Sequence, residues 1–147
     1  MVENMNDIVW AINPKNENVE KVVQRLTDFA RSTCASRDIQ LEFMAEEAAL
    51  KQKLAMESMK NIYLIVKEAM NNAIKHAACH TLKVTVKSQA GSLEISVFDD
   101  GKGFDPKLVR TGNGLFNMES RVKEMKGSVR IQSESQYTAV VFRVPIT

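Results

Sequence analysis

The chain has 147 residues, enough for one domain with its own core, and 44% of them are hydrophobic. Its net charge of +2 and its 6% of aromatic residues disfavour a nucleic-acid-binding surface, and no apolar run approaches the roughly 18 residues of a membrane span. The N-terminus lacks a signal-peptide pattern, and two cysteines cannot make a disulfide framework, so we expect a reducing, cytoplasmic environment.

The first third of the chain predicts helices around a single strand. Apolar residues at helical spacing predict a short helix over residues 3–12, which Pro14 ends because it displaces the preceding residue from the helical region. Residues 17–36 predict a longer amphipathic helix. The strict alternation over residues 39–44 predicts a strand with one buried face, and residues 45–56 predict a loop with a helical turn.

The third predicted helix, residues 57–78, is the longest and most apolar. A polar set interrupts its surface: Glu68, Asn72, Lys75 and His76. The first three of these follow at steps of four and three residues, so they project from one face. Such a face can be ordinary solvated surface. Asparagine is nevertheless a poor helix former when it does not cap a helix, and this favours a functional role.

The second half of the chain predicts a sheet broken by one helix. The expected strands cover residues 82–86, 93–98, 128–133 and 137–144, and the helix covers residues 115–126. A turn over residues 90–92 joins the first two strands, and Gly127 is expected to cap the helix at its C-terminus. We therefore predict an α+β fold, a two-layer α/β sandwich with helices on one face of a mixed sheet.

A glycine-rich segment, residues 99–115, lies between a strand and a helix. It holds four of the six glycines: Gly101, Gly103, Gly112 and Gly114. The leading acid, Asp99, can accept a hydrogen bond from a base, and amides at the start of the following helix can face phosphate. Two ordinary turns would explain the glycines alone, because a lone Gly-x-Gly is a weak signal. The layout suits a nucleotide.

Three motifs now stand in a fixed order. They are Glu68-x-x-x-Asn72-x-x-Lys75-His76, Asp99-Asp100-Gly101-Lys102-Gly103 and Gly112-Asn113-Gly114-Leu115. This order resembles the N, G1 and G2 boxes of the GHKL ATPases, which share the Bergerat ATP-binding fold. More narrowly, KEAMNNAIKHA, GLFNMESRVKEMKG and DIVWAINP are similar to segments of bacterial two-component sensor histidine kinases with a short ATP lid.

The resemblance implies ATP and Mg²⁺ as ligands and gives roles to the N-box residues. Asn72 would offer its amide oxygen to Mg²⁺, which prefers oxygen ligands. Glu68 would be the catalytic residue, orienting a metal-bound water or assisting proton removal from the attacking group. Lys75 offers a positive charge to phosphate, and His76 would reach phosphate or close the site.

The resemblance assigns the adenine end of the nucleotide to the G1 box. Asp99 would accept a hydrogen bond from the exocyclic amine of adenine, and Gly101 and Gly103 would let the backbone lie against the base. Thr138 matches a threonine that helps hold water on the adenine side, although its neighbour Tyr137 replaces the usual glycine. The lid and G2 box would close over the triphosphate through Gly112, Asn113, Gly114 and Leu115.

The implied function is transfer of the ATP γ-phosphoryl group to a histidine on a dimerisation helix, for relay to a response regulator. Residues 1–14 would be the end of that helix, and residues 15–147 the catalytic domain. We expect no autophosphorylation by this chain alone, since its two histidines, His76 and His80, lie in the wrong context for an acceptor. The parent kinase would be a homodimer, and its membrane anchoring is left open.

Three alternatives stay open from the sequence. His76, Cys79 and His80 have a spacing that could hold Zn²⁺, but a fourth ligand is lacking. An anti-sigma-factor serine kinase uses the same boxes in a chain of similar size. A non-catalytic module that binds nucleotide or docks a partner is the third, and the intact Asn72, Asp99 and four loop glycines disfavour it.

Overall fold

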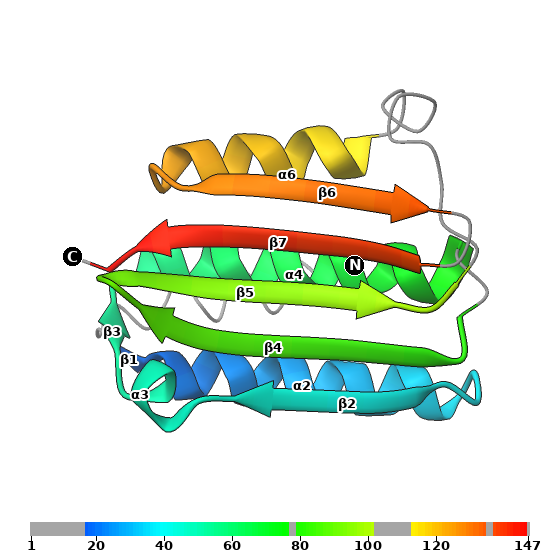
Figure 1. The fold of residues 1–147 in the computed structure, drawn as a ribbon. Helices are drawn as coiled ribbons and strands as arrows, with labels where there is room; N and C mark the ends of the chain where they lie inside the picture. Colours follow the sequence, from blue (N-terminus) through cyan, green and yellow to red (C-terminus); the bar gives the residue numbers. More distant parts are fainter. Residues whose placement is uncertain (1–16, 77–78, 102–112, 135–136, 147) are drawn as a thin grey trace.

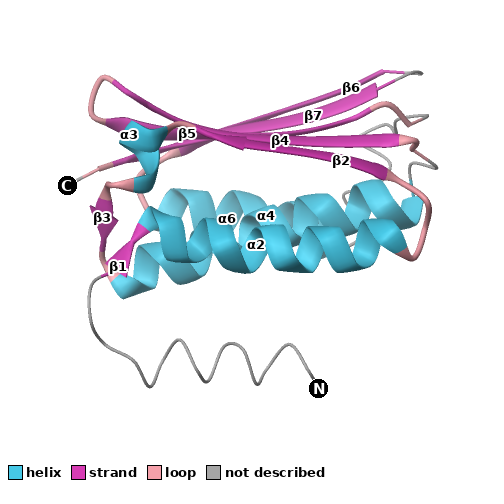
Figure 2. Ribbon diagram, turned by 90° about the horizontal axis from the view of Figure 1, so that it is seen from below, coloured by secondary structure: helices cyan, strands magenta, loops and turns pink. Residues whose placement is uncertain are grey.

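The structure, a computed structural model, describes residues 17–76, 79–101, 113–134 and 137–146. It forms two layers, a five-stranded sheet and a layer of helices against one of its faces (Figures 1 and 2). The helices are α2 (Val19–Ala35), α4 (Met56–His76) and α6 (Asn113–Glu124). The strands are β2 (Gln40–Ala45), β4 (Thr81–Gln89), β5 (Ser92–Asp99), β6 (Ser128–Glu134) and β7 (Tyr137–Pro145). The predicted fold class is confirmed.

The sheet is mixed because one of its strand pairs is parallel. Its order is β2-β4-β5-β7-β6, in which β2 and β4 run parallel and the other neighbours run antiparallel. A two-residue turn, Ala90 and Gly91, joins β4 to β5, and both residues have positive φ angles (51° and 79°). Such a turn matches the twist of the strands it connects. The predicted hairpin is therefore confirmed.

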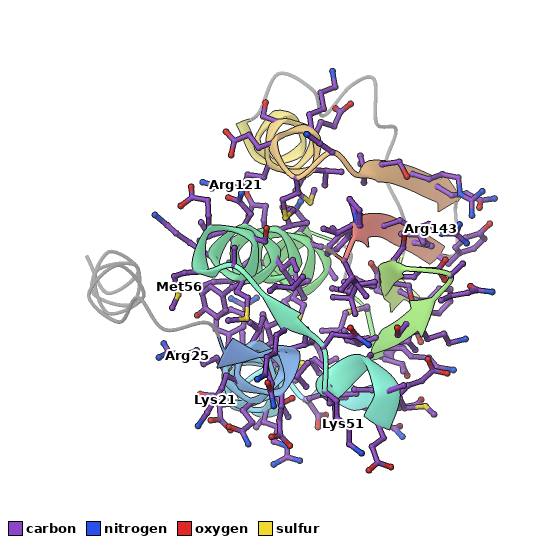
Figure 3. The ribbon with its side chains drawn as sticks, turned by 90° about the vertical axis from the view of Figure 1, so that its left-hand side faces the viewer. Lys21, Arg25, Lys51, Met56, Arg121 and Arg143 are labelled. Carbon is purple, nitrogen blue, oxygen red and sulfur yellow. The ribbon has the colours of Figure 1, made fainter. Side chains whose placement is uncertain are left out.

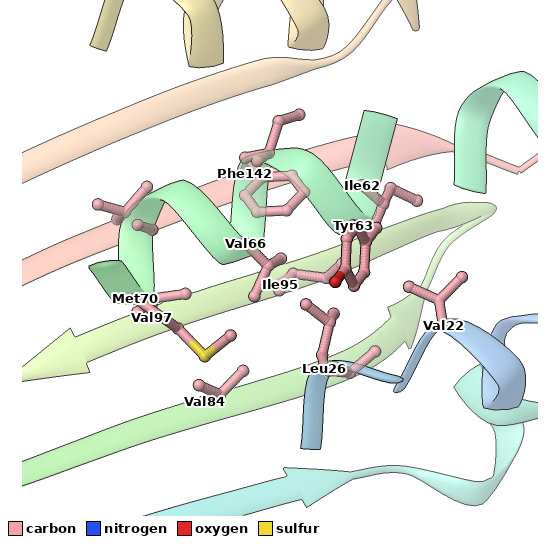
Figure 4. Close-up of a cluster of buried hydrophobic side chains, with 14 of the residues drawn as sticks. Val22, Leu26, Ile62, Tyr63, Val66, Met70, Val84, Ile95, Val97 and Phe142 are labelled. Carbon is pink, nitrogen blue, oxygen red and sulfur yellow. The ribbon is translucent and has the colours of Figure 1, made fainter. Parts of the chain in front are cut away.

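The core lies between the two layers (Figure 4). Helix α4 lies against the middle of the sheet and runs along β5 and β7, and its apolar stripe, including Ile62, Val66 and Met70, is buried. Alternate residues of the strands face this stripe, among them Ile95 and Phe142, so the period-2 pattern of the sequence becomes one dry face of the sheet. Within the described residues, no helix has the length and hydrophobicity needed to cross a membrane.

The start of the described chain differs from the sequence prediction. The helix expected from residue 17 begins at Val19, because Glu17–Asn18 form a short strand, β1, that pairs antiparallel with β3 (Lys53–Leu54). The predicted helical turn is present as α3 (Glu47–Leu50). β1 and β3 lie about 35 residues apart in sequence, so the local pattern could not reveal their pairing.

The end of α6 also requires a correction. Gly127 does not take the left-handed conformation expected of a C-terminal cap; Lys126 does, with a φ of 59°. The Lys126 amide donates to the Lys123 carbonyl (2.9 Å), and the Gly127 amide donates to the Val122 carbonyl (2.9 Å), which is the Schellman pattern. Glycine is needed one residue later for a different reason, because a Cβ on Gly127 would lie 2.1 Å from the carbonyl oxygen of Arg143.

Opposite the helices, the other face of the sheet is open and mostly polar. Arg143 on β7 projects there (Figure 3) and donates to Glu94 on β5 across 2.8 Å. On the helical side, Lys21 and Arg25 of α2 project outward (Figure 3). A buried side chain, Asn61 on α4, joins two helices by accepting from Arg121 (3.2 Å) and donating to Glu124 (3.4 Å) on α6.

Candidate functional site

The three sequence motifs meet at one end of the molecule. The C-terminal end of α4, the last residues of β5, the start of α6 and the start of β7 all lie at the right-hand end in Figure 1. This follows from topology: α4 runs into β4, β5 returns antiparallel to β4, and β7 starts beside the end of β5. Segments more than 30 residues apart in sequence therefore border one region of the surface.

The leading acid of the glycine motif, Asp99, ends β5 and is only 3% exposed. Its Oδ1 accepts a hydrogen bond from the Gly101 amide at 2.9 Å, and no other hydrogen bond to this carboxylate comes from the described residues. Burial raises the pKa of Asp99, an effect that the Gly101 bond opposes and the nearby Asp100 charge reinforces. A buried carboxylate with acceptor capacity to spare suits a ligand that brings a donor.

Thr138 lies directly across the sheet from Asp99. The two residues are paired in the β5–β7 register, and both are buried. Phe98 and Tyr137, which precede these two residues in their strands, are diagonal neighbours that point to the other face of the sheet, where the two rings stack with centroids 5.8 Å apart. The tyrosine that replaces the expected glycine therefore directs its ring away from the Asp99–Thr138 corner and does not fill it.

The metal and catalytic candidates lie on α4. Glu68 and Asn72 are both half-buried, one helical turn apart, and so present a carboxylate and an amide oxygen along one face. A set of two oxygen donors suits Mg²⁺. Beside them, Lys67 is buried, a feature absent from the sequence prediction. Its ammonium group lies 5.3 Å from the ring centroid of Phe29 and 5.5 Å from that of Tyr63.

The second acid of the motif, Asp100, has contacts that the sequence did not reveal. Its Oδ1 accepts from the amides of His80 (2.7 Å) and Thr81 (2.9 Å), at the start of β4. The Thr81 bond, with the His80 bond, lowers the pKa of Asp100 despite an opposing effect of burial. No sequence signal pointed to this role, because the partners are backbone groups 19 and 20 residues away.

Several predicted residues are placed only in part. Gly103 and Gly112 lie outside the described residues. Lys75 and His76 belong to the last turn of α4, and Asn113, Gly114 and Leu115 form the first turn of α6, but their side chains lie outside the description. The G2 motif thus opens a helix, as predicted, and the amides of its first turn have no intrahelical acceptors.

The zinc alternative gains no support. Among the described residues, no group of histidine, cysteine and acidic side chains is arranged to hold a metal. Cys79 is buried, its thiol donates to the Ala73 carbonyl (3.6 Å), and burial, with the charges of Asp99 and Asp100, raises its pKa to about 11. A zinc ligand must be a thiolate, so this environment is unfavourable.

Comparison with known proteins identifies the family. Residues 58–147 match the family described as "Histidine kinase-, DNA gyrase B-, and HSP90-like ATPase". The chain belongs to this family. The matched region contains all three motifs and every strand from β4 to β7, so the family assignment covers the whole candidate site.

Within this ATPase family, the chain is similar to two curated proteins that are both sensor histidine kinases. The sensor histidine kinase YdfH of Bacillus subtilis is 35% identical over 102 residues, which cover 66% of this chain and 25% of YdfH. The oxygen sensor histidine kinase NreB of Staphylococcus carnosus is 37% identical over 91 residues, which cover 58% of this chain and 26% of NreB. The chain thus spans about a quarter of the length of these relatives.

Solved structures share the fold of this ATPase domain. Full-length ShkA in complex with AMPPNP superimposes with a TM-score of 0.76 at 18% identity, covering 92% of this chain and 31% of ShkA. At this level of identity, the likeness concerns the fold alone.

Proposed function

We propose that this chain is the ATP-binding catalytic domain of a sensor histidine kinase, which transfers the γ-phosphoryl group of ATP to a histidine on a dimerisation helix. The observation that carries the proposal is the buried Asp99 carboxylate, with spare acceptor capacity, at the end where the three family motifs meet. The similarity to YdfH and NreB favours the histidine kinase branch over an anti-sigma-factor kinase.

Each part of the nucleotide has a proposed partner in the chain. Asp99 accepts from the exocyclic amine of adenine and so selects against guanine, which has a carbonyl at that position. The amides at the start of α6 face the phosphates, where the helix N-terminus favours negative charge. Because phosphoryl transfer depends mainly on positioning and charge neutralisation, these few groups suffice for the donor half of the site.

Asn72 and Glu68 are the residues proposed to hold and assist Mg²⁺. The metal would neutralise phosphate charge when bound. Asn72 offers a neutral oxygen, and Glu68, one turn away, orients a water or accepts a proton from the attacking group. The acceptor histidine, the response regulator and the homodimer of the parent kinase belong to the same proposal.

The test is calorimetric titration of the chain with ATP, ADP and GTP, each with and without Mg²⁺. We expect adenine nucleotides to bind, GTP to bind at least tenfold more weakly, and Mg²⁺ to strengthen ATP binding in the parent but less in Asn72→Ala. In a separate assay, the chain is mixed with ATP and an acceptor-histidine helix domain from YdfH or NreB. We expect acid-labile phosphate to appear on that domain. Absence of nucleotide binding would overturn the proposal, and binding without transfer would leave a nucleotide-binding module.

A further inference from the structure

Asp100 extends the contact between β4 and β5 beyond the end of their ladder. Regular pairing of the two strands stops at Leu82 and Asp99. Beyond it, Asp100 Oδ1 accepts from the amides of His80 (2.7 Å) and Thr81 (2.9 Å), and the Asp100 amide donates to the Thr81 carbonyl (3.3 Å). Hydrogen bonds to an ionised carboxylate are stronger than those between neutral groups. The residue after β5 is therefore hydrogen-bonded to the first residue of β4, Thr81, and to His80 before it.

Residues 79–81 are also hydrogen-bonded to two other elements, β2 and α4. The His80 carbonyl accepts from the Gln40 amide (2.8 Å), at the start of β2. Cys79, next to it, is buried and donates to the Ala73 carbonyl of α4. Residues 79–81 therefore contact β2, α4 and the end of β5 at once, and two residues, 77 and 78, separate them from the end of α4 in the chain. One chain of hydrogen bonds thus runs from Ala73 near the C-terminal end of α4, through residues 79–81, to Asp100 after β5.

We propose that Asp100 is a positioning residue for the nucleotide site, which fixes the end of α4 relative to Asp99 by holding the His80 and Thr81 amides. The inference rests on the proposed function, since Asn72 and Asp99 would contact opposite ends of the same nucleotide. Asp100 itself is exposed, whereas Asp99 is buried. Its role is thus exerted through the backbone and requires no contact with the ligand.

Glu46 offers a matched control at the other end of β4. Its Oε1 accepts from the Ser88 amide (3.0 Å), so it is also an exposed carboxylate that binds backbone beyond a strand end. It lies at the end of the sheet away from the motifs. Glu46→Ala should therefore lower the stability of the fold as Asp100→Ala does. It should not change the nucleotide site, because Glu46 has no part in positioning it.

The experiment measures the Kd of ADP by calorimetry and the thermal midpoint of four proteins: the parent, Asp100→Ala, Asp100→Asn and Glu46→Ala. We expect the Kd to rise about tenfold in Asp100→Ala, equivalent to about 1.4 kcal/mol, and to stay within about threefold of the parent in Asp100→Asn, which keeps an acceptor oxygen. Glu46→Ala should bind ADP like the parent, even if its thermal midpoint falls as much as that of Asp100→Ala. If Asp100→Ala does not fold, Asp100→Val replaces it, because valine suits extended backbone and also has no acceptor for the two amides, and the same loss is expected.

The outcomes separate this inference from the proposed function. If the parent binds ADP and Asp100→Ala binds it equally well, Asp100 does not position the site, and the proposed function stands. If Glu46→Ala loses as much affinity as Asp100→Ala, the effect is one of general stability, which also overturns the inference. If the parent itself does not bind ADP or ATP, both fail.

Discussion

At the scale of single residues, Asp99 is held in a site that is unfavourable for its own charge. In the protein without ligand this carboxylate is buried away from water. Among the described residues, only the Gly101 amide donates a hydrogen bond to it. A ligand donor would compensate for that loss of hydration. Binding strength and fold stability are therefore expected to respond in opposite directions when the charge is removed.

Replacing Asp99 by asparagine tests this opposition. Asp99→Asn keeps an oxygen for the Gly101 amide but removes the charged acceptor, so the Kd of ATP should rise roughly 10- to 100-fold, corresponding to about 1.5–3 kcal/mol. The thermal midpoint at neutral pH should be no lower than that of the parent, since the variant no longer buries a charge. Calorimetry and thermal unfolding measure the two effects. Unchanged ATP affinity would show that Asp99 does not bind adenine.

The raised pKa of Asp99 also predicts a pH dependence. Only the ionised carboxylate is a pure acceptor, so adenine-nucleotide affinity should fall as pH drops through a pKa above the ordinary 3.8. For folding the sign is reversed: because the folded state holds the proton more tightly, this group stabilises the fold less as pH rises through the same window. Asp100 has a lowered pKa, so its stabilisation is present above 3.8 and is lost on further acidification.

The control for this pH series is the Asp99→Asn variant, which retains every titration that belongs to the nucleotide. The Kd of ADP is measured for both proteins over the same pH range, and the difference between the two curves isolates Asp99. Parallel curves would contradict the assignment.

The sequence indicated the surroundings of single residues unevenly. Asp99 was identified because an acid at a strand end before spaced glycines is a recognisable motif. Asp100 and Lys67 were not, since their partners are backbone amides and aromatic rings that only the fold brings near. The ligand-binding and catalytic assignments of all the predicted site residues, Asp99 included, stay predictions.

At the scale of elements, periodicity predicted what lies within one helix or strand and failed for contacts between elements. α4 and the strands from β4 to β7 follow their hydrophobic patterns closely. The end of α6 does not follow its local pattern. Glycine is needed at position 127 because the backbone there lies close to Arg143 on β7, 16 residues further along the chain. The β1–β3 pair escaped prediction for the same reason, since two-residue strands carry no period.

The close approach of α6 to β7 can be tested at Gly127. Gly127→Ala places a Cβ against the backbone of Arg143, so either the helix end or the strand must shift, and we expect a loss of about 1–3 kcal/mol in the free energy of unfolding. Lys126→Gly is the control, because it relieves a side chain at positive φ and should not destabilise. Urea denaturation measures both; equal stability of Gly127→Ala and the parent would contradict this account.

At the scale of the whole molecule, stability comes from the single core between sheet and helices. Phe142 on β7 is 0% exposed and lies at its centre, whereas Phe98 on β5 is 37% exposed on the open face. Phe142→Ala should therefore lower the free energy of unfolding by about 3–5 kcal/mol through lost burial and a cavity. Phe98→Ala should cost much less. The midpoints of urea denaturation, at unchanged slope, measure the difference, and similar losses would contradict a one-sided core.

The two-layer architecture was predictable because helices and alternating strands have few ways to bury one face each. The strand order was not predicted, since β2 joins the edge of the sheet through a parallel pairing with β4. That pairing depends on contacts between segments about 40 residues apart, and no local pattern encodes it. The convergence of the motifs at one end of the molecule follows from this order.

The pairing of Asp99 with Thr138 has a consequence for synthesis of the protein. The Asp99–Thr138 corner, which we propose binds adenine, combines the end of β5 with the second residue of β7, the last strand that the structure describes. A growing chain has already made both glycine motifs before β7 leaves the ribosome, yet it cannot complete the corner. Nucleotide would then bind only after β7 has entered the sheet between β5 and β6, and cellular ATP would act as a late stabiliser of the finished domain.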